Sequence, residues 1–446
     1  MGTRQIALLP LLGALAAACV GGNALAAEDY ETPPAAKASQ LLPKTVLKGP
    51  HHTIDEAVPL QGLFYRYRIQ STFGTFEAVG SPLLAVRLKE IDALERLSGT
   101  SEFSVAMKSV GDSLATAAKG AAHAVANPEE TVKGIPGGVG RAFGRIGRKA
   151  KRTAEKGQET VDEGEKKEGA EAKTDEKSTT ETATNASASV AKGALGVSAS
   201  RRRWAKELGV DPYTSNPALS AALDKVAEID AAGRFATKLV PGMAALSAVS
   251  NVDSLVYEKE PDELMTLNET RLKAMGVDGG TSRDLRLNKN IRLGPQTRIV
   301  GALDAMKGVA DRDAFIERAA SADDEVGAHY FAVGAEMLER FHRTQAPLVR
   351  IVPARAAAVA LAKNNRLVHL LPVDSVSWTK EVAEAANGAT QRAKEDFTGS
   401  KPELWTSGRV SVRARKELES RGWAVHERSL RPPEIEAALK AAAPKK

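Results

Sequence analysis

The 446-residue chain contains a single cysteine, Cys19, so it cannot form an internal disulfide bond. A metal site made of several cysteine thiolates is excluded for the same reason. Aromatic residues make up only 4% of the sequence, although 43% of the residues are hydrophobic. We therefore expect alanine-rich helices with small aliphatic side chains, in a chain long enough to build two hydrophobic cores.

Long hydrophobic runs are also missing beyond the N-terminal segment. Residues 6–20 are apolar but are interrupted by a proline and a glycine, and no other stretch approaches the roughly 20 apolar residues of a membrane span. An arginine precedes this run and small residues follow it, so residues 1–26 are typical of a secretory signal peptide. We expect an exported protein located in the periplasm. In the alternative, the leader is of the lipoprotein type and Cys19 carries a lipid anchor.

Enzyme motifs are missing as well. The chain has no G-x-S-x-G elbow, no P-loop, no H-E-x-x-H and no dinucleotide-binding glycine motif in a suitable strand–helix unit. We therefore expect neither catalysis nor a cofactor. The net charge of +6 favours an anionic neighbour, such as lipid headgroups or a cell-wall polymer, and export argues against nucleic acid.

The clearest functional pattern is the segment VGRAFGRIGRKAKR at residues 139–152. Wound as a helix, it has a narrow apolar stripe on one side and a face of arginines on the other. Such a basic amphipathic segment is typical of one that binds an anionic membrane surface or an acidic partner. Its three glycines each cost roughly 1 kcal/mol against alanine, so the helix should need a surface on which to form. The predicted contact residues are Arg141, Phe143, Arg145, Ile146 and Arg148.

A second interpretation of this segment is structural. The apolar stripe would pack on the protein's own core, and the arginines would face water, as in most amphipathic helices of folded proteins.

The predicted fold class is α-rich α+β: a helical bundle plus a small C-terminal α/β domain, with a short N-terminal β-hairpin and a disordered charged linker. The linker is predicted because it is dense in charged residues and has almost no aliphatic residues beyond alanine, so it cannot bury a core. Alternatively, both ordered parts fold together and the linker is an excursion from their surface. The predicted boundaries are 1–26 for the signal peptide, 27–60 for a disordered arm, 61–152 for the hairpin with amphipathic helices and the basic segment, 153–195 for the linker, 196–346 for the helical domain, 347–430 for the α/β domain and 431–446 for the tail.

Short apolar runs alternate with helix-like stretches after residue 347. The runs are LVRIVP, RLVHLLPV, ELWTSG and WAVHERS, and the helix-like stretches are 354–363, 380–397 and 412–421. This alternation predicts a small parallel sheet with right-handed crossovers.

Ligands of an open parallel sheet bind beyond the carboxyl ends of its strands. The hydroxyl, carboxylate and guanidinium groups expected there would suit an anionic or sugar-like ligand. Alternatively, the serines only cap helices and the arginines face solvent. The predicted ligand-site residues are Arg355, Asp374, Ser377, Thr406, Ser407 and Arg409.

Acidic residues and histidines recur between residues 325 and 342, with an E-x-x-H spacing used in metal-binding bundles. On a helical wheel, however, they lie at the edge of the apolar face or beyond it. We therefore expect a solvated polar face and no metal site. The residues concerned are Glu325, His329, Glu336, Glu339 and His342.

The sequence thus predicts a non-catalytic envelope protein that associates with a membrane surface or a partner through its basic segment. The alternative is a ligand-binding or hydrolytic α/β domain that acts at the strand ends. A distinctive turn, DPYTSNP at residues 211–217, separates two predicted helices, and the sequence attaches no activity to it.

Overall fold

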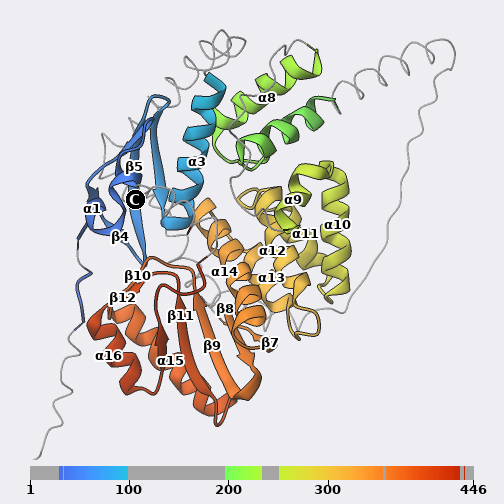
Figure 1. Cartoon of the computed structure of the whole chain (residues 1–446). Coiled ribbons are helices and arrows are strands. Elements are labelled where there is room, and N and C mark those ends of the chain that lie inside the picture. Colours follow the sequence, from blue (N-terminus) through green and yellow to red (C-terminus); the bar gives the residue numbers. More distant parts are fainter. Residues whose placement is uncertain are drawn as a thin grey trace, which may run out of the picture.

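The computed structural model describes residues 30–33, 35–98, 196–233, 251–354, 358–431 and 436. Within these residues the chain is an α-rich α+β protein with three parts: a small N-terminal sheet beside a long helix, a group of helices, and a C-terminal sheet flanked by helices (Figure 1). The predicted signal peptide, basic segment, linker and most of the tail lie outside the described residues.

The predicted disordered arm is wrong for most of its length, because regular structure begins at residue 36. Two short helices and four short strands lie in this region. Their buried side chains Ala38, Val46 and Val58 pack in the same core as the side chains of the sheet. Each element has only two to four residues, which is too short to show a hydrophobic period. The elements are β1 (Ala36–Lys37), α1 (Ala38–Leu41), α2 (Lys44–Leu47), β2 (His52–Ile54), β3 (Ala57–Val58) and β4 (Leu60–Gln61).

The hairpin predicted at the start of residues 61–152 is present as an antiparallel strand pair. It consists of β5 (Phe64–Ser71) and β6 (Gly74–Val79), and β2 and β4 also pair with β5. Gly74 has a φ of 108° at the turn, a backbone conformation that residues other than glycine rarely adopt.

Helix α3 (Ser81–Ser98) is shared by the N-terminal sheet and the helical part of the molecule. Leu84 and Ile91 pack against the sheet. Farther along the helix, Leu94 and Leu97 pack against Trp204 in the helical residues 196–208. Ala85 of the same helix lies in the core of α12 and α14, so one helix contributes to three hydrophobic cores.

The helical part packs around two long helices, α12 and α14, with a core that includes Ile299, Leu303, Met337 and Phe341. No helix in the described part of the chain is long and apolar enough to cross a membrane. The elements are α8 (Pro217–Ala231), α9 (Asn251–Glu258), α10 (Pro261–Ala274), α11 (Gly279–Leu287), α12 (Leu293–Ala305), α13 (Asp313–Ala320) and α14 (Glu325–Thr344).

The C-terminal sheet is mixed rather than parallel, which corrects the prediction. Its order is β13 (Ala424–His426), β11 (Lys401–Thr406), β9 (Arg366–Leu371), β8 (Ala358–Ala362) and β7 (Leu348–Val352). β13, β11 and β9 run parallel, whereas β8 is antiparallel to both of its neighbours. The segment 354–363, predicted to be helical, holds β8, because Ala358, Ala360 and Ala362 are buried between β7 and β9 and tertiary context overrides the helical preference of alanine.

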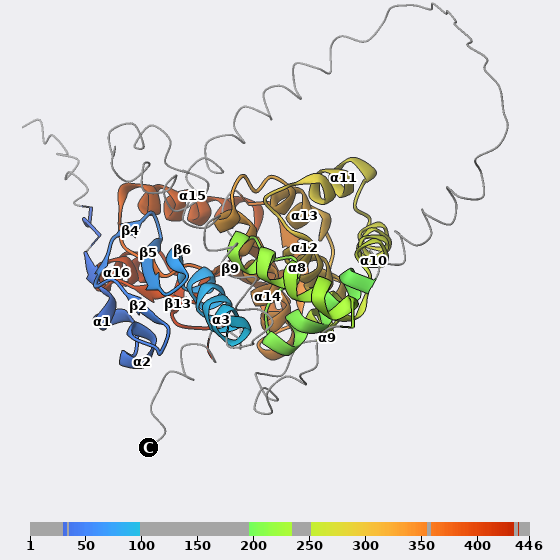
Figure 2. The same ribbon diagram turned by 90° about the horizontal axis from the view of Figure 1, so that it is seen from above.

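Helices cover both faces of this sheet, as the views in Figures 1 and 2 show. Side chains alternate between the faces along each strand. On β9, Val368 and Leu370 share a core with α14, whereas Leu367 packs with Phe397 after α15 (Lys380–Asp396). A separate two-stranded pair, β10 (Ser375–Val376) with β12 (Arg409–Val410), leads to α16 (Val412–Ser420).

The described segments on either side of residues 99–195 contribute to one core. α3 ends at Ser98, the described chain resumes as a helix at residue 196, and Leu97 lies in the same hydrophobic cluster as Trp204 and Leu208. The helix that precedes residues 99–195 and the helix that follows them therefore share a core, as expected if both ordered parts fold together.

Limited proteolysis within residues 153–195 tests this arrangement. We expect the two fragments to co-elute on size exclusion, because α3 and the helices after residue 196 share buried leucines. Leu94→Asp should separate the cleaved fragments, since it places a charge in that core. The matched control is Val412→Asp, at a side chain that is 88% exposed. Fragments of the unsubstituted protein that elute apart would contradict the shared core.

Candidate functional site

The structure brings half of the predicted strand-end residues together. Asp374, Ser407 and Arg409 line a small cavity with Tyr67 and Ser81 of the N-terminal part. Ser377 and Thr406 are buried and do not line that cavity. Arg355 lies outside the described residues.

Asp374 connects the N-terminal and C-terminal parts of the protein. Its carboxylate accepts hydrogen bonds from the backbone amides of Tyr65 and Ser81, at 2.9 and 3.0 Å. Burial raises the pKa of Asp374, and these hydrogen bonds oppose that shift. The cavity beside it has a volume of about 50 Å³, and since water occupies roughly 30 Å³ in the liquid, only a few water molecules fit. The Asp374 carboxylate is therefore held by backbone amides of the N-terminal part.

A larger cavity, here called the junction pocket, has a volume of about 190 Å³. It opens where α3, α9, the turn after residue 208, and the first turns of α12 and α14 meet. Its lining combines carboxylates, cations, hydroxyls and one histidine, and the polar lining residues used below are Lys89, Glu90, Lys206, Asp211, Tyr213, Thr214, Ser215, Arg292, Arg298, Glu325 and His329.

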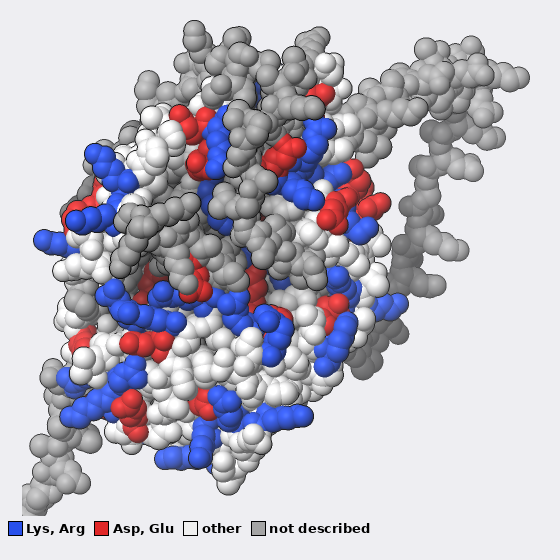
Figure 3. Space-filling model, viewed as in Figure 1, with Lys and Arg blue, Asp and Glu red and all other residues white. Residues whose placement is uncertain are grey.

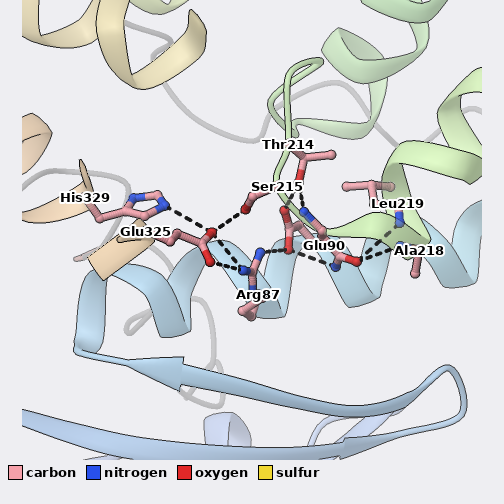
Figure 4. A network of polar contacts seen from close by, with 9 residues as sticks. Arg87, Glu90, Thr214, Ser215, Ala218, Leu219, Glu325 and His329 are labelled. Carbon is pink, nitrogen blue, oxygen red and sulfur yellow. Dashed lines mark hydrogen bonds and ion pairs between the residues drawn. The ribbon is translucent and has the colours of Figure 1, made fainter. Parts of the chain in front are cut away.

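A buried guanidinium organises the floor of this pocket. Arg87 donates to Glu90 at 2.7 Å and to both carboxylate oxygens of Glu325 at 2.7 and 2.8 Å (Figure 4). Arg87 and Glu90 stand three residues apart on α3 and therefore share a face, whereas Glu325 belongs to the first turn of α14. One cation thus holds two helices together through two carboxylates.

The DPYTSNP turn completes the network from above. The Thr214 hydroxyl donates a hydrogen bond to Glu90, and the Ser215 hydroxyl donates one to Glu325 (Figure 4). The side-chain amide of Asn216 also donates to Glu90, at 3.0 Å. The oxygen of Asn216 caps α8 by accepting from the amides of Ala218 and Leu219. The turn therefore both starts a helix and binds the two carboxylates.

Asp211, the first residue of this turn, places its carboxylate against the start of α12. One of its oxygens accepts from the Tyr213 amide at 2.8 Å, and the other fills the space where a side chain on Gly294 would begin, 1.9 Å from the ideal Cβ position. α12 has no side-chain cap of its own, so this negative charge near its N-terminus is favourable. Burial raises the pKa of Asp211, and the Tyr213 amide and Arg298 oppose that shift.

The other ionisable groups of the pocket have contrasting surroundings. Burial acts to raise the pKa of Glu325, but His329, Arg87 and Ser215 together lower it to about 2, so the group is a carboxylate at neutral pH. His329 stands 3.8 Å from Glu325, one turn farther along α14. Burial raises the pKa of Tyr213 to about 12, and its buried hydroxyl has no hydrogen-bond partner within the described part of the chain.

The expectation of a solvated polar face on α14 is wrong for its first two turns. Glu325 and His329 are partly buried in the junction pocket, and Glu336 pairs with Arg298 at 2.6 Å. Glu339 pairs with Arg343 at 2.9 Å, and His342 accepts from the Leu348 amide. Among the described residues, no group of three or more acidic, histidine or cysteine side chains is arranged to hold a metal ion.

Sequence reasoning did not identify Arg87, Glu90 and Asp211 as members of a site. Arg87 and Glu90 lie on α3, and Asp211 lies in a turn more than 100 residues later. The sequence around each of them is typical of an ordinary helix or turn. The distinctive turn at residues 211–217 was the one local signal, since it contains several side chains that hydrogen-bond backbone or neighbouring groups.

The described surface mixes charges of both signs. On the face drawn in Figure 3, Lys and Arg side chains are interspersed with Asp and Glu. The positions predicted to bind a membrane or partner, Arg141, Phe143, Arg145, Ile146 and Arg148, lie outside the described residues.

Arg87→Ala tests the importance of the buried ion pairs. We expect a loss of about 3–5 kcal/mol in the free energy of unfolding, because Glu90 and Glu325 would remain buried without their counter-charge. Arg96→Ala on the same helix removes an exposed pair with Asp92 and should cost at most about 1 kcal/mol. Chemical denaturation measures both, and equal losses for the two variants would contradict a special role for Arg87.

Comparison with known proteins gives no counterpart for this arrangement. No protein-family model, no curated protein and no solved structure matches the chain. The chemistry of the junction pocket therefore rests on its own residues: three carboxylates, four cations, a histidine and a buried tyrosine hydroxyl between helices of two parts of the fold.

Proposed function

We propose that this protein binds a small polar ligand in the junction pocket. The observation that carries the proposal is a cavity of about 190 Å³ that contains two polar groups with unused binding capacity. Among the described residues, the Tyr213 hydroxyl has no hydrogen-bond partner and the Asp211 carboxylate has no ion pair. Buried polar groups are normally satisfied, so a ligand with complementary groups would complete both.

The volume limits the ligand to a small molecule. A protein cavity of roughly 150 Å³ holds benzene, whereas drug-sized ligands need about 300 Å³ or more. A compound somewhat larger than benzene, of the size of one amino acid or one monosaccharide, therefore suits the junction pocket. Five separate segments line it, and junctions between parts of a fold are common places for ligand sites.

Binding is favoured over hydrolysis by the contacts of the hydroxyl groups. Ser215 donates to Glu325 and Thr214 donates to Glu90, so neither hydroxyl is paired with His329 as a nucleophile would be with its base. Both carboxylates are occupied by Arg87. These contacts suit a rigid binding site.

Ligand-observed NMR with a library of small polar compounds tests the proposal. We expect saturation transfer from the unsubstituted protein to at least one compound, and loss of that signal in Val86→Trp, because the larger side chain would fill the pocket from α3. The matched control is Val349→Trp, at an exposed side chain on β7 outside the pocket. Equal signals from all three proteins would place binding elsewhere, and no signal in any would reject the proposal.

A second proposal concerns the segment outside the described residues. We propose that the protein is exported to the bacterial periplasm, with lipidation of Cys19 as the alternative, and associates with an anionic membrane or acidic envelope partner through residues 139–152. The supporting observation is that α3, before this segment, and the helix from residue 196, after it, share one core. That core is built without residues 139–152, so contact of these residues with a surface would not require it to open.

Liposome co-sedimentation of the chain from residue 27 onwards tests the second proposal. We expect binding to vesicles that contain anionic lipid, and a loss of at least about tenfold in affinity when Arg141, Arg145 and Arg148 are all changed to Ser, at about 1 kcal/mol for each basic residue. A triple change of Arg392, Arg413 and Arg421 to Ser keeps the same net charge and serves as control. Equal binding by the two triple variants would contradict a role for the basic segment.

A further inference from the structure

The charges of the junction pocket are separated by depth. The carboxylates of Glu90 and Glu325 line the cavity where they meet Arg87, and the side chain of Glu90 is 3% exposed and that of Glu325 31%. The cations nearer the solvent are Lys206, whose side chain is 55% exposed, and Arg292, which is exposed at the start of α12. Lys89 is half-buried between these levels.

Counting the charges at the floor leaves it negative. Arg87 is the single cation that pairs with both Glu90 and Glu325, so this trio carries one excess negative charge when His329, 3.8 Å from Glu325, is neutral. Arg298 is compensated by Glu336, at 2.6 Å. Asp211 adds a third carboxylate that has no ion pair among the described residues. Placing ionised carboxylates away from water is costly unless a positive group lies beside them.

We infer that the ligand of the junction pocket is a zwitterion of amino-acid size, with its ammonium group directed to Asp211 and Glu325 and its carboxylate to Arg292 and Lys206. This inference rests on the proposed ligand-binding function. An ammonium group donates three hydrogen bonds, so it can satisfy Asp211 and the oxygen of the Tyr213 hydroxyl together. A carboxylate accepts from the guanidinium of Arg292, which provides several donors in one plane.

The inference distinguishes a zwitterion from other polar compounds of the same size. A neutral sugar would leave the excess negative charge at the floor uncompensated. A simple anion would place a second negative charge near Asp211. A simple amine would leave Arg292 at the rim unused, since Lys206 already lies 3.9 Å from Glu258. Only a ligand with opposite charges at its two ends complements both levels of the pocket.

Isothermal titration with free amino acids tests the inference, with the N-acetyl derivative and the amide of each binding amino acid as probes. We expect at least one free amino acid to bind. Both of its derivatives should bind with an affinity at least about tenfold lower, because each lacks one of the two charges. Asp211→Asn should weaken binding of the free amino acid by about tenfold or more, while an asparagine can still accept from the Tyr213 amide. Asp396→Asn, at an exposed helical position, is the matched control.

Two further variants keep the test decisive. Tyr213→Phe should weaken binding by about threefold to tenfold through loss of one hydrogen bond, and Arg292→Gln should do so mainly at low salt. Binding of neutral or anionic compounds as tightly as zwitterions, or unchanged binding by Asp211→Asn, would overturn the inference and leave the ligand-binding proposal intact. No binding by any amino acid would also overturn it, and the NMR library experiment decides the broader proposal separately.

Discussion

The buried contact of Arg87 with Glu90 and Glu325 is the interaction on which the arrangement of the described parts depends. It joins α3 to α14, and the turn at residues 211–217 attaches to the same two carboxylates. A buried ion pair adds little net stability when it is intact, because desolvation offsets much of the attraction. It is, however, costly to break, so it favours this relative position of the helices over others.

The junction pocket follows from this constraint. α3 packs its leucines into two different cores and Ala85 into the core of α14, whereas its buried Arg87 and Glu90 require polar partners. The DPYTSNP turn supplies those partners while it caps α8. What remains between the helices is a cavity whose floor is acidic and whose rim is basic, and this separation of charge is the basis of the proposed ligand chemistry.

Much of the secondary structure could be predicted from local patterns, and the failures have identifiable causes. The hairpin within residues 61–152 and the helices at 380–397 and 412–421, which show clear periods or caps, match β5 with β6, α15 and α16. β8 was mistaken for a helix, because its alanines have a helical preference but are buried between two strands. Because of that error, a parallel sheet was predicted where the structure has a mixed one. The short strands before residue 62 were missed because pairing, rather than a local pattern, stabilises them.

The sequence by itself determined the absence of disulfide bonds, the shortage of aromatic side chains, the α-rich composition and the basic amphipathic pattern at residues 139–152, since these depend only on which residues are present and in what order. The tertiary structure decided which charges meet. Arg87, Asp211 and Glu325 lie far apart in the chain, and their separation in space depends on how α3, the turn and α14 pack. Coulombic energies and desolvation depend on that distance and burial, so the junction pocket and the role of Asp374 as a connection between the two sheets became visible only in the folded protein.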